Sequence, residues 1–284
     1  MKTIDKKMLA KAGEDRFLSD YHYAVYEYYR STKIIKEFDN EGIDYAKAVI
    51  LDDGCGSGGI TVSLGEESAL AVGIDISPKF KDAAVKLSDE LKINRAKFIQ
   101  SDGCALPFKN GVFDLIISHS VIEHVKDPLN YLQEACRILK PGGILFLETP
   151  PYYSFEGTHL PKPAFPIPFQ LFIPRTALYR IYLFIGKRWP EFFRDGRKGS
   201  ALLCGMERGE HPRLEELNKM KIGKIRRLVG KTQFSISREK LYHPCGFDKI
   251  FPGFIISFLK WLPLTRNFVV NTYKIFLLKS RKAV

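Results

Sequence analysis

The feature that most constrains this chain is an apolar run that ends in two acids and a glycine-rich turn, residues 49–58 with the sequence VILDDGCGSG. A short apolar run bounded by glycine is typical of a buried parallel strand. Glycines after such a strand let the backbone turn sharply and let a ligand approach without a Cβ in the way. The next residues, 59–64, open a helix whose N-terminal amides face that ligand. The segment therefore predicts a site for a nucleoside-type cofactor.

The spacing of these glycines differs from the dinucleotide fingerprint G-x-G-x-x-G. Asp52 and Asp53 would also repel a pyrophosphate, whereas a cationic ligand would be attracted to at least one of the two carboxylates. The pattern therefore favours a positively charged cofactor over a nicotinamide dinucleotide. The alternative is a glycine turn of an ordinary α/β sheet that binds nothing.

Strands and helices are predicted to alternate along the first half of the chain. Strands separated by helical segments form βαβ units and a parallel sheet. We expect an α/β fold: a doubly wound, Rossmann-like, mostly parallel seven-stranded sheet with helices on both faces. The predicted strands are 48–53, 69–75, 96–101, 113–118, 143–149, 232–242 and 271–280, and the predicted helices are 20–38, 57–65, 78–92, 128–139 and 214–228.

Four further segments follow the glycine turn in a fixed order. They are Val72 to Ser77 (VGIDIS), Asp102 to Phe108 (DGCALPF), Phe113 to Val125 (FDLIISHSVIEHV) and Arg137 to Gly143 (RILKPGG). Over about residues 45–150 this series resembles class I S-adenosylmethionine (SAM) methyltransferases, and within them the type 11 group that includes quinone-biosynthesis methyltransferases. SAM carries a sulfonium and an ammonium and no phosphate, which fits the acids of the turn.

The resemblance implies a role for each segment in holding SAM. Asp52 holds the amino group, directly or through water, and the turn passes under the methionine part. Asp75 binds the ribose hydroxyls, and Asp102 accepts from the adenine amino group. The implied cofactor-binding residues are Asp52, Gly54, Cys55, Gly56, Gly58, Asp75, Ile76, Asp102, Gly103, Cys104 and His119.

Asp53 departs from the family pattern, which has an aliphatic residue at this position. A buried carboxylate without a partner is costly. We therefore expect Asp53 to face solvent, to find a partner or to be protonated.

The resemblance also implies that the chemistry asks little of the protein beyond aligning the acceptor with the methyl group. A base is needed only when the acceptor holds a proton of high pKa. The candidate bases are His124, His159 and Glu156, which follow the fourth and fifth strands, at the edge where ligands bind in such sheets. Alternatively, His124 packs or caps a helix and His159 is a loop histidine. The five cysteines form no CxxC pair, and we expect no metal ligand and a reduced chain.

Three units are expected along the chain. Residues 1–150 form the SAM-binding core with an N-terminal helical cover. Residues 151–212 are rich in Pro, Phe, Tyr and Arg and form a lid or acceptor insertion after the fifth strand. Residues 213–284 complete the sheet and include an apolar segment, 250–264.

Charge is distributed unevenly, since residues 160–284 hold 25 of the 44 Lys and Arg but only 8 of the 32 Asp and Glu. This asymmetry indicates an anionic partner for the second half, or else a solvated basic surface. Segment 250–264 is too short to span a bilayer of ~30 Å. It could lie in a membrane interface with Lys260 and Trp261 at headgroup level, or pack on the sheet.

The leading hypothesis is a SAM-dependent methyltransferase that acts on a small-molecule or lipid-like acceptor. Because the N-terminus has no apolar signal region, we expect a cytoplasmic protein. Peripheral attachment to an anionic membrane is the alternative that the basic half and segment 250–264 suggest. One alternative is a nucleic-acid-modifying methyltransferase that grips phosphates with the basic half. It is less favoured, because no RNA-binding module is present in the sequence. The other is a SAM-binding interaction module without catalysis.

Overall fold

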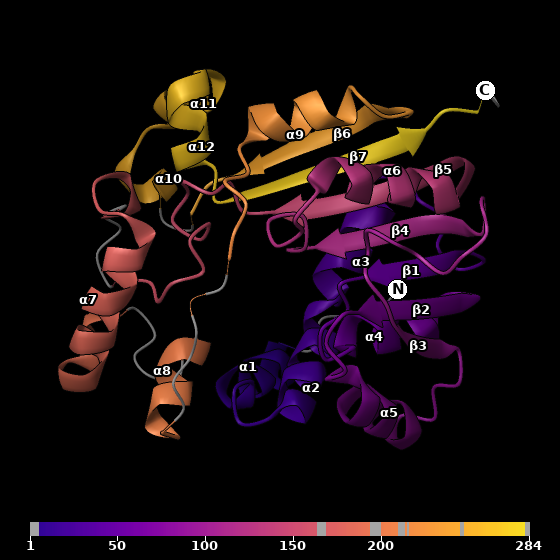
Figure 1. Cartoon of the computed structure of the whole chain (residues 1–284), viewed down its shortest axis with the longest axis horizontal. Coiled ribbons are helices and arrows are strands. Elements are labelled where there is room, and N and C mark those ends of the chain that lie inside the picture. Colours follow the sequence, from indigo (N-terminus) through magenta and orange to yellow (C-terminus); the bar gives the residue numbers. More distant parts are fainter. Residues whose placement is uncertain are drawn as a thin grey trace.

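The computed structural model describes residues 6–163, 169–193, 200–209, 214, 216–244 and 247–281. Its centre is a seven-stranded sheet in the order β3-β2-β1-β4-β5-β7-β6 (Figure 1). Neighbouring strands from β3 to β5 are parallel, and β7 is antiparallel to both β5 and β6. The predicted α/β class and mostly parallel sheet are therefore confirmed. The strands are β1 (Val49–Asp53), β2 (Leu70–Asp75), β3 (Ala96–Gln100), β4 (Phe113–His119), β5 (Leu139–Thr149), β6 (Phe234–Tyr242) and β7 (Thr272–Lys279).

Helices cover both faces of this sheet. Those that do so include α3 (Thr32–Asn40), α4 (Gly59–Glu67), α5 (Phe80–Glu90), α6 (Pro128–Ile138) and α9 (Ile222–Val229). Ile50 and Leu51 of β1 are both buried and point to opposite faces, because successive strand residues alternate. Ile50 packs in a cluster with Phe38 of α3, and Leu51 belongs to a second cluster with Tyr131 of α6 and Ile222 of α9. Burial on both faces explains the continuous apolar run of the strand.

The N-terminal cover is divided differently from the predicted single helix over 20–38. After α1 (Lys6–Asp15) come α2 (Asp20–Arg30) and then α3, which are separated at Ser31. The Ser31 hydroxyl donates to Tyr28 O at 2.6 Å, and the Thr32 hydroxyl donates to Tyr29 O at 2.7 Å. Such bonds from side chain to backbone compete with the helical pattern. The predicted helix is therefore present as two.

The predicted helix over 214–228 is wrong in its first half, because α9 begins only at Ile222. In the segment before it, Asn218 N donates to Glu123 O at 2.6 Å and Met220 O accepts from Tyr152 N at 2.8 Å. These bonds tie residues 216–221 to the loops after β4 and β5. Apolar spacing alone could not reveal these long-range partners.

Strand β5 begins four residues earlier than predicted, at Leu139 instead of 143. Leu139 pairs with Phe113, and the register between β4 and β5 then shifts before Leu115 meets Ile144. The helix therefore ends at Ile138, the strand begins at the next residue, and the Pro-Gly-Gly segment lies inside β5.

Residues 151–212 contain α7 (Arg175–Arg188), α8 (Ala201–Glu207) and two short 3₁₀ turns, Phe169–Leu171 and Pro190–Phe192. Figure 1 shows α7 and α8 beyond the sheet, on the side to which β4 and β5 point. They share an apolar cluster that is separate from the two sheet clusters. Its buried members are Leu160, Leu178, Tyr182, Phe193 and Leu203.

In the described residues between β6 and β7 there are three helices, α10 (Phe247–Ile250), α11 (Gly253–Trp261) and α12 (Pro263–Val269). Phe254, Phe258 and Trp261 of α11 are 75%, 56% and 69% exposed, so the expectation that they pack on the sheet is wrong. The membrane-interface alternative placed the Lys260 ammonium at headgroup level. In the structure this ammonium instead donates to Leu241 O at 2.9 Å and is partly buried. Among the described helices, none has the length and apolar character needed to cross a membrane.

Candidate active site

The glycine turn after β1 is held against β2 by its own backbone. Gly54 N and Cys55 N both donate to Ile74 O, at 2.9 and 2.8 Å. Gly56 has a φ of +56°, and a Cβ added there would meet nothing within 4 Å, so a ligand can approach this backbone closely. Gly58 has a φ of +83°, and an added Cβ would lie 2.5 Å from Ala84 Cβ of α5. The two glycines therefore serve different purposes, ligand access and helix packing.

Two of the predicted acids lie at the ends of the neighbouring strands. Asp75 Oδ2 accepts from Gly56 N at 2.9 Å, and Asp75 Oδ1 accepts from Ser77 N at 2.8 Å. Asp102 Oδ1, after β3, accepts from Cys104 N at 2.8 Å. Because β1, β2 and β3 are parallel neighbours, these groups share one carboxyl edge. Beside them the apolar side chain of Ile76 is 71% exposed, which leaves it available to cover a ligand.

Asp52 and Asp53 are both buried, and burial is the main cause that raises their pKa values. The pKa of Asp52 rises to about 6, although the Thr61 hydroxyl donates to its Oδ2 at 2.6 Å and opposes the rise. The pKa of Asp53 rises to about 7, and its Oδ2 accepts no hydrogen bond from the described residues. Of the three expectations for Asp53, exposure to solvent is therefore wrong. The Tyr131 hydroxyl is a partner that opposes the rise in the pKa of Asp53, but burial outweighs it, which favours the protonated form.

A fifth carboxyl group, Glu27 of α2, was missed by the sequence analysis. Burial raises its pKa to about 8, while Arg30 at 3.7 Å opposes the rise. Burial also raises the pKa of the Cys55 thiol, and the charges of Asp52, Asp75 and Glu27 raise it further. Glu27 lies on the buried face of α2, between Ala24 and Tyr28. Helical spacing could have identified it, since a lone acid on an apolar face is unusual.

His119 ends β4 next to this group of acids. Its Nε2 lies 3.6 Å from Glu148 Oε1, and its Nδ1 lies 3.5 Å from Arg30 Nη2. Burial works to raise the pKa of Glu148, but its contacts with His119, Lys274 and Arg30 lower it to about 2. His119 is thus held in a fixed position at the cofactor edge.

The candidate bases are brought together only in part. The rings of His124 and His159 meet edge to face with centroids 4.9 Å apart. The buried Glu123, which the sequence analysis did not select, lies with Oε1 3.5 Å from His159 Nε2. Glu156 forms an ion pair with Lys162 at 2.5 Å, so its carboxylate is already engaged.

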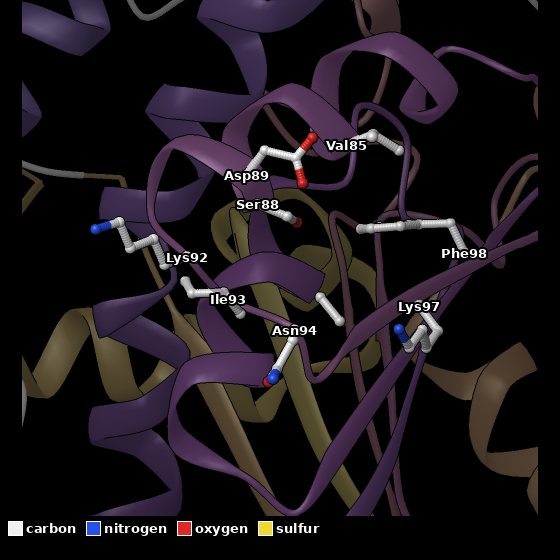
Figure 2. A pocket seen from close by; sticks show the side chains of 9 residues that line it. Val85, Ser88, Asp89, Lys92, Ile93, Asn94, Lys97 and Phe98 are labelled. Atoms are coloured by element: carbon white, nitrogen blue, oxygen red, sulfur yellow. The ribbon is translucent and has the colours of Figure 1, made fainter.

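A groove elsewhere on the surface does not belong to this site. Figure 2 shows that Ser88 and Asp89 of α5, Lys92 in the turn after it and Phe98 of β3 line it. It lies toward the amino end of β3, whereas ligands in such sheets bind at the carboxyl ends. We assign no catalytic role to it.

Comparison with known proteins gives the same result as this geometry. A family described as a methyltransferase domain matches residues 51–147. A demethylmenaquinone methyltransferase from Lactococcus lactis is 31% identical over 183 residues, which cover 59% of this chain and 70% of that protein. The chain belongs to the SAM-dependent methyltransferase family. A ubiquinone biosynthesis O-methyltransferase from Xanthomonas oryzae is 34% identical over 107 residues, which cover 38% of this methyltransferase and 45% of that protein, about half its length.

Solved structures share the fold of this methyltransferase. A sarcosine dimethylglycine methyltransferase from Galdieria sulphuraria aligns with a TM-score of 0.55 at 16% identity, over 89% of this chain and 86% of that one. A magnesium protoporphyrin IX methyltransferase from Synechocystis, solved with bound SAH, aligns with a TM-score of 0.51 at 16% identity, over 92% and 86%. SAM is the cofactor that the family and the acid-lined turn both indicate.

We expect Asp75→Ala and Asp102→Ala each to weaken SAM binding by about tenfold or more, because a lost charge-assisted hydrogen bond is worth ~1.5–3 kcal/mol. Calorimetric titration with SAM and with SAH measures the change. Asp89→Ala, an exposed acid in the groove of Figure 2, is the matched control and should bind as the parent does. Binding of NAD but of neither SAM nor SAH would contradict the assignment.

We expect Asp53→Asn to flatten the pH dependence of stability. The carboxyl titrates near its ordinary value of 3.8 when unfolded and at about 7 when folded, so the folded state binds the proton more tightly. Its contribution to stability is complete below the lower value and is lost as pH rises through the higher one. Urea unfolding at about pH 5 and about pH 8 should show a smaller loss in the variant than in the parent. Equal losses in both proteins would show that Asp53 is not protonated in the fold.

Proposed function

We propose that this methyltransferase methylates a quinone-related ring that carries a hydroxyl group and an apolar side chain. The observation that carries the proposal is the position of Glu123, His124 and His159, at the ends of β4 and β5. Strand β4 pairs with β1, so this group lies on the same sheet edge as the cofactor turn. The names of the two curated relatives, which both concern quinones, support this acceptor class.

The cofactor roles in this proposal follow the contacts of the acids. Asp75 holds the ribose hydroxyls while it keeps the Gly56 amide in place. Asp102 orders the Gly103 and Cys104 backbone that faces the adenine. Asp52 has the lowest pKa of the three buried acids, and we assign to it the attraction of the ammonium and sulfonium charges.

When bound, SAM supplies a methyl group whose bond to sulfur breaks, with its electron pair left on sulfur, as the acceptor atom forms the new bond. The residues of the chain hold the acceptor in line with that bond and exclude water. They also promote the loss of the ring hydroxyl proton, which makes the ring electron-rich at oxygen and carbon. We assign this second task to Glu123, His124 and His159. Glu156 is not included, because it is paired with Lys162.

Residues 151–212 form the cover of the acceptor site in this proposal. They follow β5 directly, so they leave the sheet at its carboxyl edge. The loop from Pro151 to Leu160 carries His159, and it is tied to the body of the protein by the bond from Tyr152 N to Met220 O. A cover that holds one of the acceptor-side residues can bring it into place when the acceptor binds.

An anionic membrane surface is the proposed location of the acceptor. Phe254, Phe258 and Trp261 share one face of α11, and the rings of the last two stack at 6.2 Å. Three aromatic side chains gathered on one exposed helix face are typical of an interfacial helix. The excess of Lys and Arg in residues 160–284 supplies the charge complement, at ~1 kcal/mol for each group near the lipid surface.

We expect the purified protein, given labelled SAM, to methylate a dihydroxylated aromatic ring. The same ring with an apolar side chain should react with a lower KM, because that side chain buries apolar surface when the acceptor binds. Transfer RNA serves as the competing acceptor class in a parallel assay. Label that appears in RNA and in neither ring compound would overturn the proposed acceptor.

We expect the protein to co-sediment with vesicles that contain an anionic phospholipid, and less so as salt is raised. Replacing Phe254, Phe258 and Trp261 together by Ser should remove most of this binding. Replacing Val85, Leu91 and Ile99, which are also exposed but lie on α5, the turn after it and β3, should leave it unchanged. Retained vesicle binding in the α11 variant would show that this helix is not the membrane contact.

A further inference from the structure

Three side chains that can bind a metal ion converge between the loops after β4 and β5. They are Glu123 and His124, which follow β4, and His159, which follows β5. One ligand atom from each lies within 4.8 Å of the other two. The chain between His124 and His159 includes all of α6 and β5, so the fold alone creates this group.

The buried carboxylate of Glu123 is only half satisfied. Its Oε2 accepts from the Thr149 hydroxyl at 2.8 Å. Its Oε1 accepts no hydrogen bond within the described part of the chain, although the side chain is only 4% exposed. A buried charge in this state is costly unless a cation lies beside it. The unsatisfied oxygen is the one that faces His159 Nε2, at 3.5 Å.

His159 is held toward Glu123 by a strained backbone. Its φ of +54° lies in the left-handed region, which is uncommon for a residue other than glycine. The Arg175 side chain donates to Thr158 O at 2.8 Å, and His159 N donates to Glu156 O at 3.1 Å, which fixes the loop that leads into His159. Strain of this kind persists where the position of the side chain matters.

We propose that Glu123, His124 and His159 bind a divalent first-row transition-metal ion such as Zn²⁺. Two imidazole nitrogens and one carboxylate oxygen form the ligand set of open zinc and iron sites, whereas Mg²⁺ prefers oxygen ligands. Ligand atoms around such an ion lie roughly 3–3.5 Å apart, so the three side chains close by about an ångström. This inference departs from the expectation of no metal ligand, which rested on the cysteines.

The open positions of the ion face the acceptor side, and this role rests on the proposed function. A ring hydroxyl oxygen of the acceptor occupies one of them. Its O–H bond breaks, the electron pair stays on oxygen, and the proton passes to water. The ion thereby lowers the pKa of the ring hydroxyl, and the imidazoles serve as ligands instead of bases.

Metal binding is tested without acceptor or SAM, on chelator-treated protein that carries no histidine tag. We expect one equivalent of Co²⁺ to bind with a visible absorption band, one equivalent of Zn²⁺ to displace it, and an equal concentration of Mg²⁺ to leave it in place. Glu123→Gln and His159→Ala should each weaken Co²⁺ binding at least tenfold. His22→Ala, a histidine on α2, is the control. Calorimetric titration with SAM confirms that each variant is folded.

Failure of Co²⁺ and Zn²⁺ to bind, displacement by Mg²⁺, or binding that the Glu123 and His159 variants leave unchanged would each overturn the proposal. These outcomes are independent of the acceptor. A protein that binds the ion but methylates no ring compound keeps the metal site and loses the proposed function. A protein that still methylates the ring after chelator treatment keeps the proposed function but overturns the role of the ion in it. Glu123 would then be the partner of a histidine base.

Discussion

The arrangement of this protein depends on carboxyl groups buried at one edge of the sheet. Asp52, Asp53 and Glu27 are removed from water, and burial raises the pKa of each. Arg30 lies 3.7 Å from Glu27 and opposes the rise there, but one guanidinium cannot neutralise three carboxyl groups. Such a site is stable when its acids are protonated or when a cationic ligand is bound. The charge of SAM therefore completes an electrostatic balance that the folded chain leaves unfinished.

Most of the fold and the cofactor edge could be predicted from the sequence, because they are set by local patterns. The apolar run of β1 is continuous since both of its faces are buried, and the glycines that follow it are required by backbone geometry at Gly56 and Gly58. Asp75 and Asp102 could also be placed from local sequence, because each comes where an apolar run ends, at or just after the end of a strand. Each of these signals lies within a few residues of the feature that it predicts.

The parts that sequence could not predict are set by contacts between distant segments. Residues 216–221 resemble a helix in spacing, yet bonds to Glu123 O and Tyr152 N hold them in another conformation. Glu123 can be recognised as a candidate site residue only in the fold, because the loop after β5 brings His159 beside it. Glu27 needed the docking of α2 against α4 to become a buried acid near Asp52. No local pattern records such pairings, since each partner is ordinary on its own.

The two groups of titratable residues suit the two changes of charge in methyl transfer. The cofactor loses its sulfonium charge when the methyl group leaves, so its attraction to Asp52, which has the lowest pKa of the three buried acids, is weaker for the product than for SAM. In the proposed function the acceptor loses a proton at the other side of the transferred methyl, and we assign that side to Glu123, His124 and His159. Because β1 and β4 are adjacent and parallel, both groups stand on one edge without sharing a side chain. A sheet that keeps these two groups apart can respond to the lost sulfonium charge and to the departing proton independently.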